Sequence, residues 1–341
     1  MFNKKKQKKE NKLIIAKTPL RISLFGGGTD FPDYFKDNPG QVLSSSIDKY
    51  TYVILNKRPF DEKIRLGYSK TELVNYVFEL DHELAREAIK LFSVSGIEMS
   101  TISDVPGGVG LATSSSILVG MLNALAVYSN VEFDVSHLID WAINIEVNRL
   151  NKPIGYQDQI IVAKGGFQNI HFSFQYKKPY NFIANFKQDT VNKLEDSLTL
   201  FYIGGQRRSS DILSEQNKNI EKNNDTLRQM YNICDSAYDE LSKGNVYDIG
   251  SMLDESWKLK KTLASNITNK EIDYVYEKAL QNGSSGGKLL GAGGNGFLLF
   301  FTRDYESKEN LLRFMKNHML QVKHVPFRFD KYGSRIIFNN E

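Results

Sequence analysis

The apolar and polar positions of the chain alternate in ways that predict both strands and helices. Ile97, Met99 and Thr101 alternate with Glu98 and Ser100, which is typical of a half-buried strand. Elsewhere apolar residues recur every three or four positions, which is typical of an amphipathic helix. In the first half of the chain we predict strands at 13–25, 42–57, 97–101 and 167–174, and helices at 83–92, 118–128 and 135–150.

The second half of the chain follows a stretch whose pattern is broken. Residues 177–196 are rich in Lys, Asn and Asp without a steady period, so we place a domain boundary there, near residue 190. Beyond it we predict strands at 198–203 and 334–338, a helix-rich region at 209–282 and a helix at 306–319. The pattern predicts an α+β protein with a tail at 1–12, a first domain at 13–190 and a second domain at 191–341.

Composition narrows the class of protein without indicating a function. The chain has 341 residues, 41% of them hydrophobic, which is enough for two domains with buried cores. No uninterrupted apolar stretch reaches the length of a membrane span. The single cysteine, Cys234, has no partner for a disulfide within the chain, so we expect it to be a small core residue. A chain without disulfides fits a reducing compartment, and we expect the cytoplasm.

The positive charge of the chain is concentrated in its first segment. Residues 1–12 contain six lysines and one glutamate, so the remaining residues carry a net charge of −1 although the whole chain carries +4. We interpret this segment as a disordered, solvated tail and expect neither a nucleic-acid nor a membrane partner. The expected partners are small molecules, and the sequence leaves the oligomeric state open.

A glycine-rich segment joins the predicted strand at 97–101 to the predicted helix at 118–128. It lies where the first N–H groups of a helix lack partners and the helix dipole is positive, so it suits a nucleotide phosphate. Its hydroxyl side chains suit phosphate or Mg²⁺. The alternative is a Ser/Thr-capped helix after a flexible loop. The residues concerned are Pro106, Gly107, Gly108, Gly110, Leu111, Ala112, Thr113, Ser114 and Ser115.

This segment differs from the two common phosphate loops. It contains no lysine, which a Walker loop requires, and it lacks the tight glycine spacing of a dinucleotide fingerprint. It resembles instead the loop Pro-x-x-x-Gly-Leu-Gly-Ser-Ser of the GHMP kinases, with Pro106, Gly110, Leu111 and Ser114 in matching positions. Ala112 stands where that loop has its second glycine, and a threonine replaces the first serine.

Two further segments carry the same resemblance. Residues 18–30, Thr-Pro-Leu-Arg-Ile-Ser-Leu-Phe-Gly-Gly-Gly-Thr-Asp, are similar to the first motif of the GHMP kinases. Residues 288–297, Lys-Leu-Leu-Gly-Ala-Gly-Gly-Asn-Gly-Phe, are similar to the third. All three motifs occur in family order, and the resemblance extends over nearly the whole chain. It implies a two-domain GHMP kinase fold with the active site in the cleft between the domains, and ATP and Mg²⁺ as cofactors.

The resemblance also implies roles for charged residues. Asp158, in a Gln-Asp-Gln segment, matches the aspartate regarded as the base in galactokinase-type members, and Arg21 matches the cation of the first motif. Glu146 has the spacing of the family's glutamate that holds Mg²⁺, here together with Ser114. From the residues alone, other interpretations stay open: a helix cap for Asp158, a structural ion pair for Arg21, and a helical pair with Arg149 for Glu146.

Glycine turns and a second anion site are the segments expected to bind the phosphate acceptor. In sugar kinases of this family the aspartate after the first glycine turn binds sugar hydroxyls. Galactokinases carry bulkier Glu-His within that turn, so glycines there should admit a larger sugar. A strand ending in glycines precedes two arginines at a predicted helix start, which suits a phosphate on the acceptor; an ordinary helix cap with solvated arginines is the alternative. The implied residues are Gly27, Gly28, Thr29, Asp30, Arg207, Arg208, Ser209, Gly293 and Gly294.

The most specific resemblance is to the heptose 7-phosphate kinases within this family. It adds the segments Pro326-Phe-Arg-Phe and Gly333-Ser-Arg-Ile-Ile to the motifs, while Asn295 departs from the usual glycine. It implies phosphorylation of the anomeric hydroxyl of D-glycero-D-manno-heptose 7-phosphate to the 1,7-bisphosphate, on the path to nucleotide-activated heptose. The alternatives are a fucose- or galactose-type kinase of a free sugar, for which Arg207 and Arg208 would be dispensable, and a non-catalytic sugar- and ATP-binding regulator. The presence of all the implied catalytic and metal-binding residues argues against the regulator.

Overall fold

The computed structural model describes residues 12–173, 180–205, 209–319 and 321–340, which form two sheets with helices packed on each. The larger sheet has the strand order β12-β1-β2-β5-β3-β4, and β6 pairs with both β2 and β7. Its strands are β1 (Leu13–Phe25), β2 (Gly40–Lys57), β3 (Ile64–Gly67), β4 (Thr71–Val74), β5 (Ile97–Ser103), β6 (Phe167–Phe172), β7 (Tyr180–Ile183) and β12 (Arg335–Asn339). The smaller sheet is antiparallel, in the order β11 (Lys323–His324), β8 (Leu198–Tyr202), β10 (Phe297–Thr302) and β9 (Ser284–Leu289).

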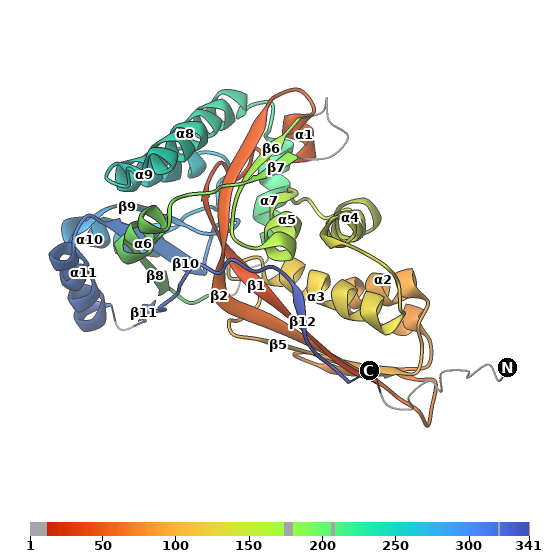
Figure 1. Ribbon diagram of the computed structural model, residues 1–341. Coiled ribbons are helices and arrows are strands. Elements are labelled where there is room, and N and C mark those ends of the chain that lie inside the picture. The colour runs from red at the N-terminus through yellow and green to blue at the C-terminus, as the bar shows by residue number, and fades with distance from the viewer. Residues whose placement is uncertain (1–11, 174–179, 206–208, 320, 341) are drawn as a thin grey trace.

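The helices divide between the two sheets. Figure 1 shows α2 (Glu83–Phe92), α3 (Thr113–Tyr128), α4 (Val135–Ile143) and α5 (Gln157–Lys164) on one side of the long strands β1 and β2, and the smaller sheet with α10 and α11 on the other. The others are α1 (Pro32–Phe35), α6 (Gln188–Ser197), α7 (Ser209–Lys218), α8 (Asn224–Lys243), α9 (Ile249–Lys260), α10 (Lys270–Gln281) and α11 (Tyr305–His318). Among the described residues, no helix is both long and apolar enough to cross a membrane.

Strand β1 belongs to both halves of the core because its pairing register with β2 shifts just before Leu20. A shift of this kind moves the following side chains to the other face of the strand. Ala16, before the shift, packs in the core under α3 and α5, whereas Leu20 and Leu24 pack in the core shared with the smaller sheet. The alternation then turns Arg21 and Ser23 toward the helices of the larger sheet, where both line a cavity.

Most predicted elements are confirmed, and the differences have local causes. The strand at 13–25 and the helix at 83–92 have the predicted bounds, and Cys234 is buried in the core. The helix predicted at 118–128 begins already at Thr113. The helix predicted at 135–150 becomes a π-helix at Asn144–Arg149. Strands β3 and β4, which are too short to show a clear alternation, were not predicted.

The end of the chain returns to the larger sheet. The predicted strand at 334–338 is found as β12, and it pairs antiparallel with β1. The last residues of the predicted second domain thus complete the sheet of the first. The boundary near residue 190 stays a prediction.

Candidate active site

The predicted phosphate loop lies between β5 and α3. Val109 and Leu111 are fully buried in the core between the two sheets and anchor the loop there. Gly108 and Gly110 have φ values of +74° and +85°, which glycine adopts without strain. Ala112 also has a positive φ, +63°, at the position where the GHMP loop has glycine. The alanine therefore keeps the backbone conformation that this position requires.

Helix α3 begins directly behind the loop with three hydroxyl residues. Its N-cap is Ala112, and no side-chain hydrogen bond caps this end of α3 in the described chain. The alternative of a Ser/Thr-capped helix is therefore wrong. The first N–H groups of α3 and its positive dipole end suit an anion. Thr113, Ser114 and Ser115 line the cavity in front of them.

This cavity, of about 540 Å³, is lined by residues of both predicted domains. The structure brings thirteen of the predicted site residues together on its wall. They are Arg21, Gly27, Gly28, Asp30, Gly108, Gly110, Ala112, Thr113, Ser114, Ser115, Glu146, Asp158 and Gly293. The predicted residues that are described but do not line it are Thr29, Pro106, Gly107, Leu111 and Gly294.

Residues away from the wall have other contacts. The Thr29 hydroxyl is fully buried and donates to the carbonyl oxygens of Gly26 and Gln41 at 2.8 and 3.0 Å, which closes the first glycine turn. The Gly294 N–H donates to the Ile267 carbonyl at 2.8 Å. Arg207 and Arg208 lie outside the described residues, as does the side chain of Ser209 at the start of α7. Their roles in substrate binding stay predictions.

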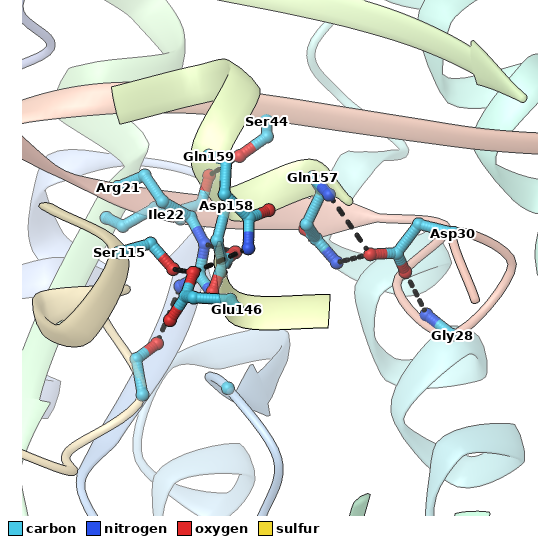
Figure 2. A network of polar contacts seen from close by, with 12 residues as sticks. Arg21, Ile22, Gly28, Asp30, Ser44, Ser115, Glu146, Gln157, Asp158 and Gln159 are labelled. Carbon is cyan, nitrogen blue, oxygen red and sulfur yellow. Dashed lines mark hydrogen bonds and ion pairs between the residues drawn. The ribbon is translucent and has the colours of Figure 1, made fainter. Parts of the chain in front are cut away.

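Arg21 and Asp158 form a bidentate ion pair on this wall (Figure 2). Arg21 Nε donates to Asp158 Oδ1 at 2.8 Å and Nη2 donates to Oδ2 at 2.9 Å, while Nη1 donates to the Gly110 carbonyl at 2.7 Å. Arg21 is only 4% exposed, and a buried charge is costly unless it is paired. The Asp158 carboxylate that it contacts supplies the compensating charge. Asp158 lies in the first turn of α5, whose N-cap is Tyr156. The aspartate is therefore held by Arg21 and does not cap the helix.

Glu146 lies in the π-helical turn and is almost fully buried. Its carboxylate accepts hydrogen bonds from Ser115 Oγ at 2.7 Å, Gln159 Nε2 at 2.6 Å and Ser114 Oγ at 3.3 Å. Burial raises the pKa of Glu146, and the Lys152 ammonium, 3.7 Å from Oε1, counteracts that shift. A π-turn inside a helix is frequent at functional sites because it redirects a side chain.

The interpretation of Glu146 as a helical partner of Arg149 is wrong, because Arg149 pairs with Glu87 at 3.5 Å. Glu146 and Ser114 instead offer a carboxylate and a hydroxyl oxygen in contact, and the buried Thr113 Oγ1 beside them has no partner in the described chain. The described residues contain no cluster of three acidic, histidine or cysteine ligands. These donors fit Mg²⁺, which prefers few protein oxygens and completes its shell with nucleotide phosphates and water.

Asp30 lies at the other end of the cavity and is held by backbone and side-chain donors (Figure 2). Its Oδ1 accepts from the Gly28 N–H at 2.9 Å, and its Oδ2 accepts from Gln157 Nε2 at 3.0 Å. Burial raises the pKa of Asp30, and the charge of Asp158 adds to that shift. Gly155 leaves room for this carboxylate, because a Cβ there would lie 1.9 Å from Asp30 Oδ2.

The third glycine segment packs directly against the phosphate loop. A Cβ on Gly291 would lie 2.3 Å from the Cα of Gly110, and a Cβ on Gly296 would lie 2.2 Å from the Val109 carbonyl oxygen. These glycines therefore allow the backbones of the two predicted domains to touch. Asn295 lines the cavity and is 8% exposed, so the departure from glycine places an amide on the wall.

Sequence reasoning missed several polar residues of the wall, among them Lys152, Gln157, Lys260 and Lys288. Two of them left a signal. Lys260 continues the buried stripe of α9 that contains Leu253 and Trp257, and Lys288 lies in the buried strand β9. Lysine is rarely buried without a partner, so a lysine at a core position of an amphipathic pattern is a candidate functional residue.

Comparisons with known proteins agree with the motifs. Residues 67–166 match the family model described as GHMP kinases N terminal domain, and residues 237–321 match the one described as GHMP kinases C terminal. Together the two models cover more than half of the chain. The expected two-domain GHMP kinase fold is confirmed.

Relatives with assigned names are similar over most of the chain. A D-glycero-alpha-D-manno-heptose 7-phosphate kinase of Campylobacter jejuni is 29% identical over 94% of this chain and 98% of that protein. A galactokinase of Pyrococcus furiosus is 25% identical over 83% of this chain and 87% of that protein. The crystal structure of a D-glycero-D-manno-heptose 1-phosphate kinase from Bacteroides thetaiotaomicron superposes with a TM-score of 0.78 at 23% identity, over 95% and 99% of the two chains. The predicted enzyme class, an ATP-dependent sugar kinase, is confirmed, and the chain belongs to the GHMP kinases.

Proposed function

We propose that this kinase transfers the γ-phosphate of ATP to the anomeric hydroxyl of D-glycero-D-manno-heptose 7-phosphate, giving the 1,7-bisphosphate and ADP. The observation that carries the proposal is the Arg21–Asp158 pair, placed on one cavity wall with the phosphate loop and Asp30. The choice of acceptor is supported by the relative named as a heptose 7-phosphate kinase. We also propose that the reaction occurs in the cytoplasm.

In this proposal Asp158 is the general base. The anomeric hydroxyl donates its hydrogen bond to the Asp158 carboxylate, and its oxygen attacks the γ-phosphorus of ATP. The new oxygen–phosphorus bond forms as the bond to the β,γ-bridging oxygen breaks, ADP leaves, and the proton passes to Asp158. Arg21 fixes the carboxylate through two hydrogen bonds and joins it to the phosphate loop through Gly110.

The nucleotide phosphates would bind at the start of α3. Backbone N–H groups of its first turn and the hydroxyls of Thr113, Ser114 and Ser115 face the cavity region that the phosphates would fill. Glu146 and Ser114 would hold Mg²⁺, which supplies charge neutralisation to the phosphates when bound. Gln159 and Ser115 keep the Glu146 carboxylate in place through hydrogen bonds of 2.6 and 2.7 Å.

The sugar would bind at the first glycine turn. Asp30 has its carboxylate oriented by Gly28 and Gln157, and it would accept hydrogen bonds from sugar hydroxyls. A Cβ on Gly27 would meet only side-chain atoms at 3.6 Å, so glycine there keeps the cavity wider than a bulky residue would. Arg207 and Arg208, with the N–H groups at the start of α7, would bind the 7-phosphate.

The direct test is a coupled assay of ADP release over a panel of free sugars and sugar phosphates. We expect the highest kcat/KM for D-glycero-D-manno-heptose 7-phosphate, with the 1,7-bisphosphate identified by phosphorus NMR. A preference for free galactose or fucose would favour the second candidate, a free-sugar kinase, which the galactokinase relative supports. ATP binding without turnover of any sugar would favour a non-catalytic regulator.

A further inference from the structure

Two lysines of the second predicted domain reach the active-site cavity, and no motif gave them a role. Lys260 ends α9 and Lys288 lies in β9, and they are 8% and 3% exposed. Lys260 Nζ donates to the carbonyl oxygens of Leu289 at 3.2 Å and Gly291 at 2.5 Å. Lys288 Nζ donates to the Leu24 carbonyl of β1 at 2.8 Å. Both side chains line the cavity.

These two are the described lining cations without a carboxylate at ion-pair distance. Arg21 pairs with Asp158, and Lys152 pairs with Glu146. The carboxylates of the described wall all precede residue 160 in the chain, and none of them forms a salt bridge with Lys260 or Lys288. Burying an ammonium without a counter-ion is costly, which favours the neutral amine until a negative ligand beside it supplies the compensating charge.

Burial and the neighbouring positive charges shift the pKa of Lys260 in the same direction. Burial lowers the pKa of Lys260 well below its ordinary value, and the charges of Lys288 and Arg21 lower it further. The Asp30 carboxylate acts in the opposite direction, through space. Lys260 thus experiences the charges at both ends of the cavity, with Arg21 on the side of the phosphate loop and Asp30 on the side of the acceptor.

The position of Lys260 relative to the phosphate loop indicates which anion it would bind. Its acceptor Gly291 touches Gly110, and Gly110 is the residue whose carbonyl accepts from Arg21 Nη1. Lys260 and Arg21 therefore reach the same point of the loop from different predicted domains. Ser23, next to Arg21 on the same face of β1, adds a buried hydroxyl without a partner in the described chain to this wall.

We propose that Lys260, supported by Lys288, binds the phosphoryl group that passes from ATP to the acceptor. Two of the three ammonium hydrogens of Lys260 are used by carbonyl oxygens, which fixes the side chain and leaves one for a phosphoryl oxygen. The second domain would thus contribute the cation opposite Arg21 as charge spreads over the phosphoryl oxygens. The inference rests on the proposed function, because it takes ATP at α3 and the acceptor at Asp30.

The test compares Lys260→Met with Lys261→Met. Methionine preserves the length of the side chain without its charge, and Lys261 is the adjacent lysine, paired with Asp273 away from the cavity. Calorimetry would measure binding of Mg²⁺ with AMP-PNP, which has a γ-phosphoryl group, and with ADP, which lacks it. For Lys260→Met we expect at least tenfold weaker AMP-PNP binding, nearly unchanged ADP binding and a kcat lower by about 10²–10³. Lys261→Met should behave as wild type.

Thermal unfolding separates ligand binding from a structural role. If Lys260 serves ligand binding, replacing this buried, unpaired lysine should leave the Tm of Lys260→Met equal or higher. If the fold depends on its hydrogen bonds to the two carbonyl oxygens, the Tm should fall. If the methionine variant does not fold, Lys260→Gln keeps a donor for the carbonyl oxygens and is measured in the same way. A wild-type preference for AMP-PNP over ADP in a folded variant would overturn the proposal.

Two further outcomes would reassign the anion or the activity. An increase in the KM of the sugar phosphate, with AMP-PNP binding unchanged, would assign Lys260 to the phosphate carried by the acceptor and overturn the present assignment. If wild type phosphorylates no sugar, the proposed function fails. The AMP-PNP and ADP measurements still decide the role of Lys260 in that case.

Discussion

Arg21 holds Asp158 through two parallel hydrogen bonds of 2.8 and 2.9 Å, and the third nitrogen of the same guanidinium binds the phosphate loop at Gly110. One buried side chain on β1 therefore sets the distance between the candidate base and the loop that would hold ATP. The planar, bidentate geometry of this pair matches a carboxylate in a way that lysine cannot. It also makes the pair a single mechanistic unit.

We expect Asp158→Asn to lower kcat by about 10²–10⁴, the usual contribution of a positioned base, with ATP affinity nearly unchanged. Steady-state kinetics and calorimetric ATP binding would measure the two quantities. Asp189→Asn is a matched control, because Asp189 is the second residue of α6 as Asp158 is of α5, and it pairs with Lys193. Turnover close to wild type in the Asp158 variant would remove this residue from the mechanism.

If Arg21 and Asp158 act together, their substitutions should not be additive. We expect Arg21→Lys to lower kcat substantially, because a lysine makes one contact where arginine makes two to Asp158 and one to Gly110. Adding Asp158→Asn should then cost little beyond the worse single variant. A double-mutant cycle on kcat measures this, and additive losses would show that Arg21 acts independently of the base.

The glycine motifs made the position of the cavity predictable, whereas much of its wall depends on tertiary structure. Asp158, Glu146 and Arg21 could be predicted because each lies near a recognisable motif. Lys260 and Lys288 reach the wall because α9 packs against β9 and β1, and because the Lys288 side chain extends to the Leu24 carbonyl of β1. Contacts between segments so far apart in the chain are hard to predict from a single sequence. The register shift in β1 and the π-turn at Glu146 are likewise set by packing.

The Mg²⁺ assignment gives a prediction about metal concentration. Glu146→Gln should raise the Mg²⁺ concentration needed for half-maximal turnover, because a neutral amide binds a hard cation more weakly than a carboxylate does. A magnesium titration at saturating ATP would measure the shift. Glu87→Gln, which removes the partner of Arg149 outside the cavity, serves as the control and should titrate as wild type. If Glu146→Gln gave the same magnesium titration curve as Glu87→Gln, Glu146 would not be a ligand of the metal.

The sugar-phosphate assignment depends on Arg207 and Arg208. Replacing both with alanine should lower kcat/KM for heptose 7-phosphate by roughly 10²-fold or more, given about 1.5–3 kcal/mol for a hydrogen bond to a charged group. Any turnover of unphosphorylated heptose should scarcely change, because that substrate lacks the phosphate. Equal losses on the two substrates would point to a folding role for the arginines. A wild type that prefers the free sugar would contradict the acceptor itself.

The burial of Lys288 predicts how stability depends on pH. Burial, followed by the charge of Arg21, lowers the pKa of Lys288 to about 7, whereas an unfolded lysine has a pKa near 10.4. Between these values the unfolded chain binds a proton that the folded chain does not, so the free energy of unfolding should rise with pH. Below about pH 7 both states carry the proton, and the cost of burying the charge is present in full.

Lys288→Met removes this dependence. The free energy of unfolding of wild type relative to the variant should be flat below about pH 7 and should increase from there toward pH 10, by at most about 1.4 kcal/mol per pH unit. Urea unfolding of both proteins at several pH values would measure the difference, in which groups common to both largely cancel. Lys288→Arg is the counterpart, since arginine stays charged and should remain destabilised relative to methionine across the range. Parallel curves for wild type and Lys288→Met would show that Lys288 keeps an ordinary pKa, and the buried ammonium would then need a counter-charge already within the chain.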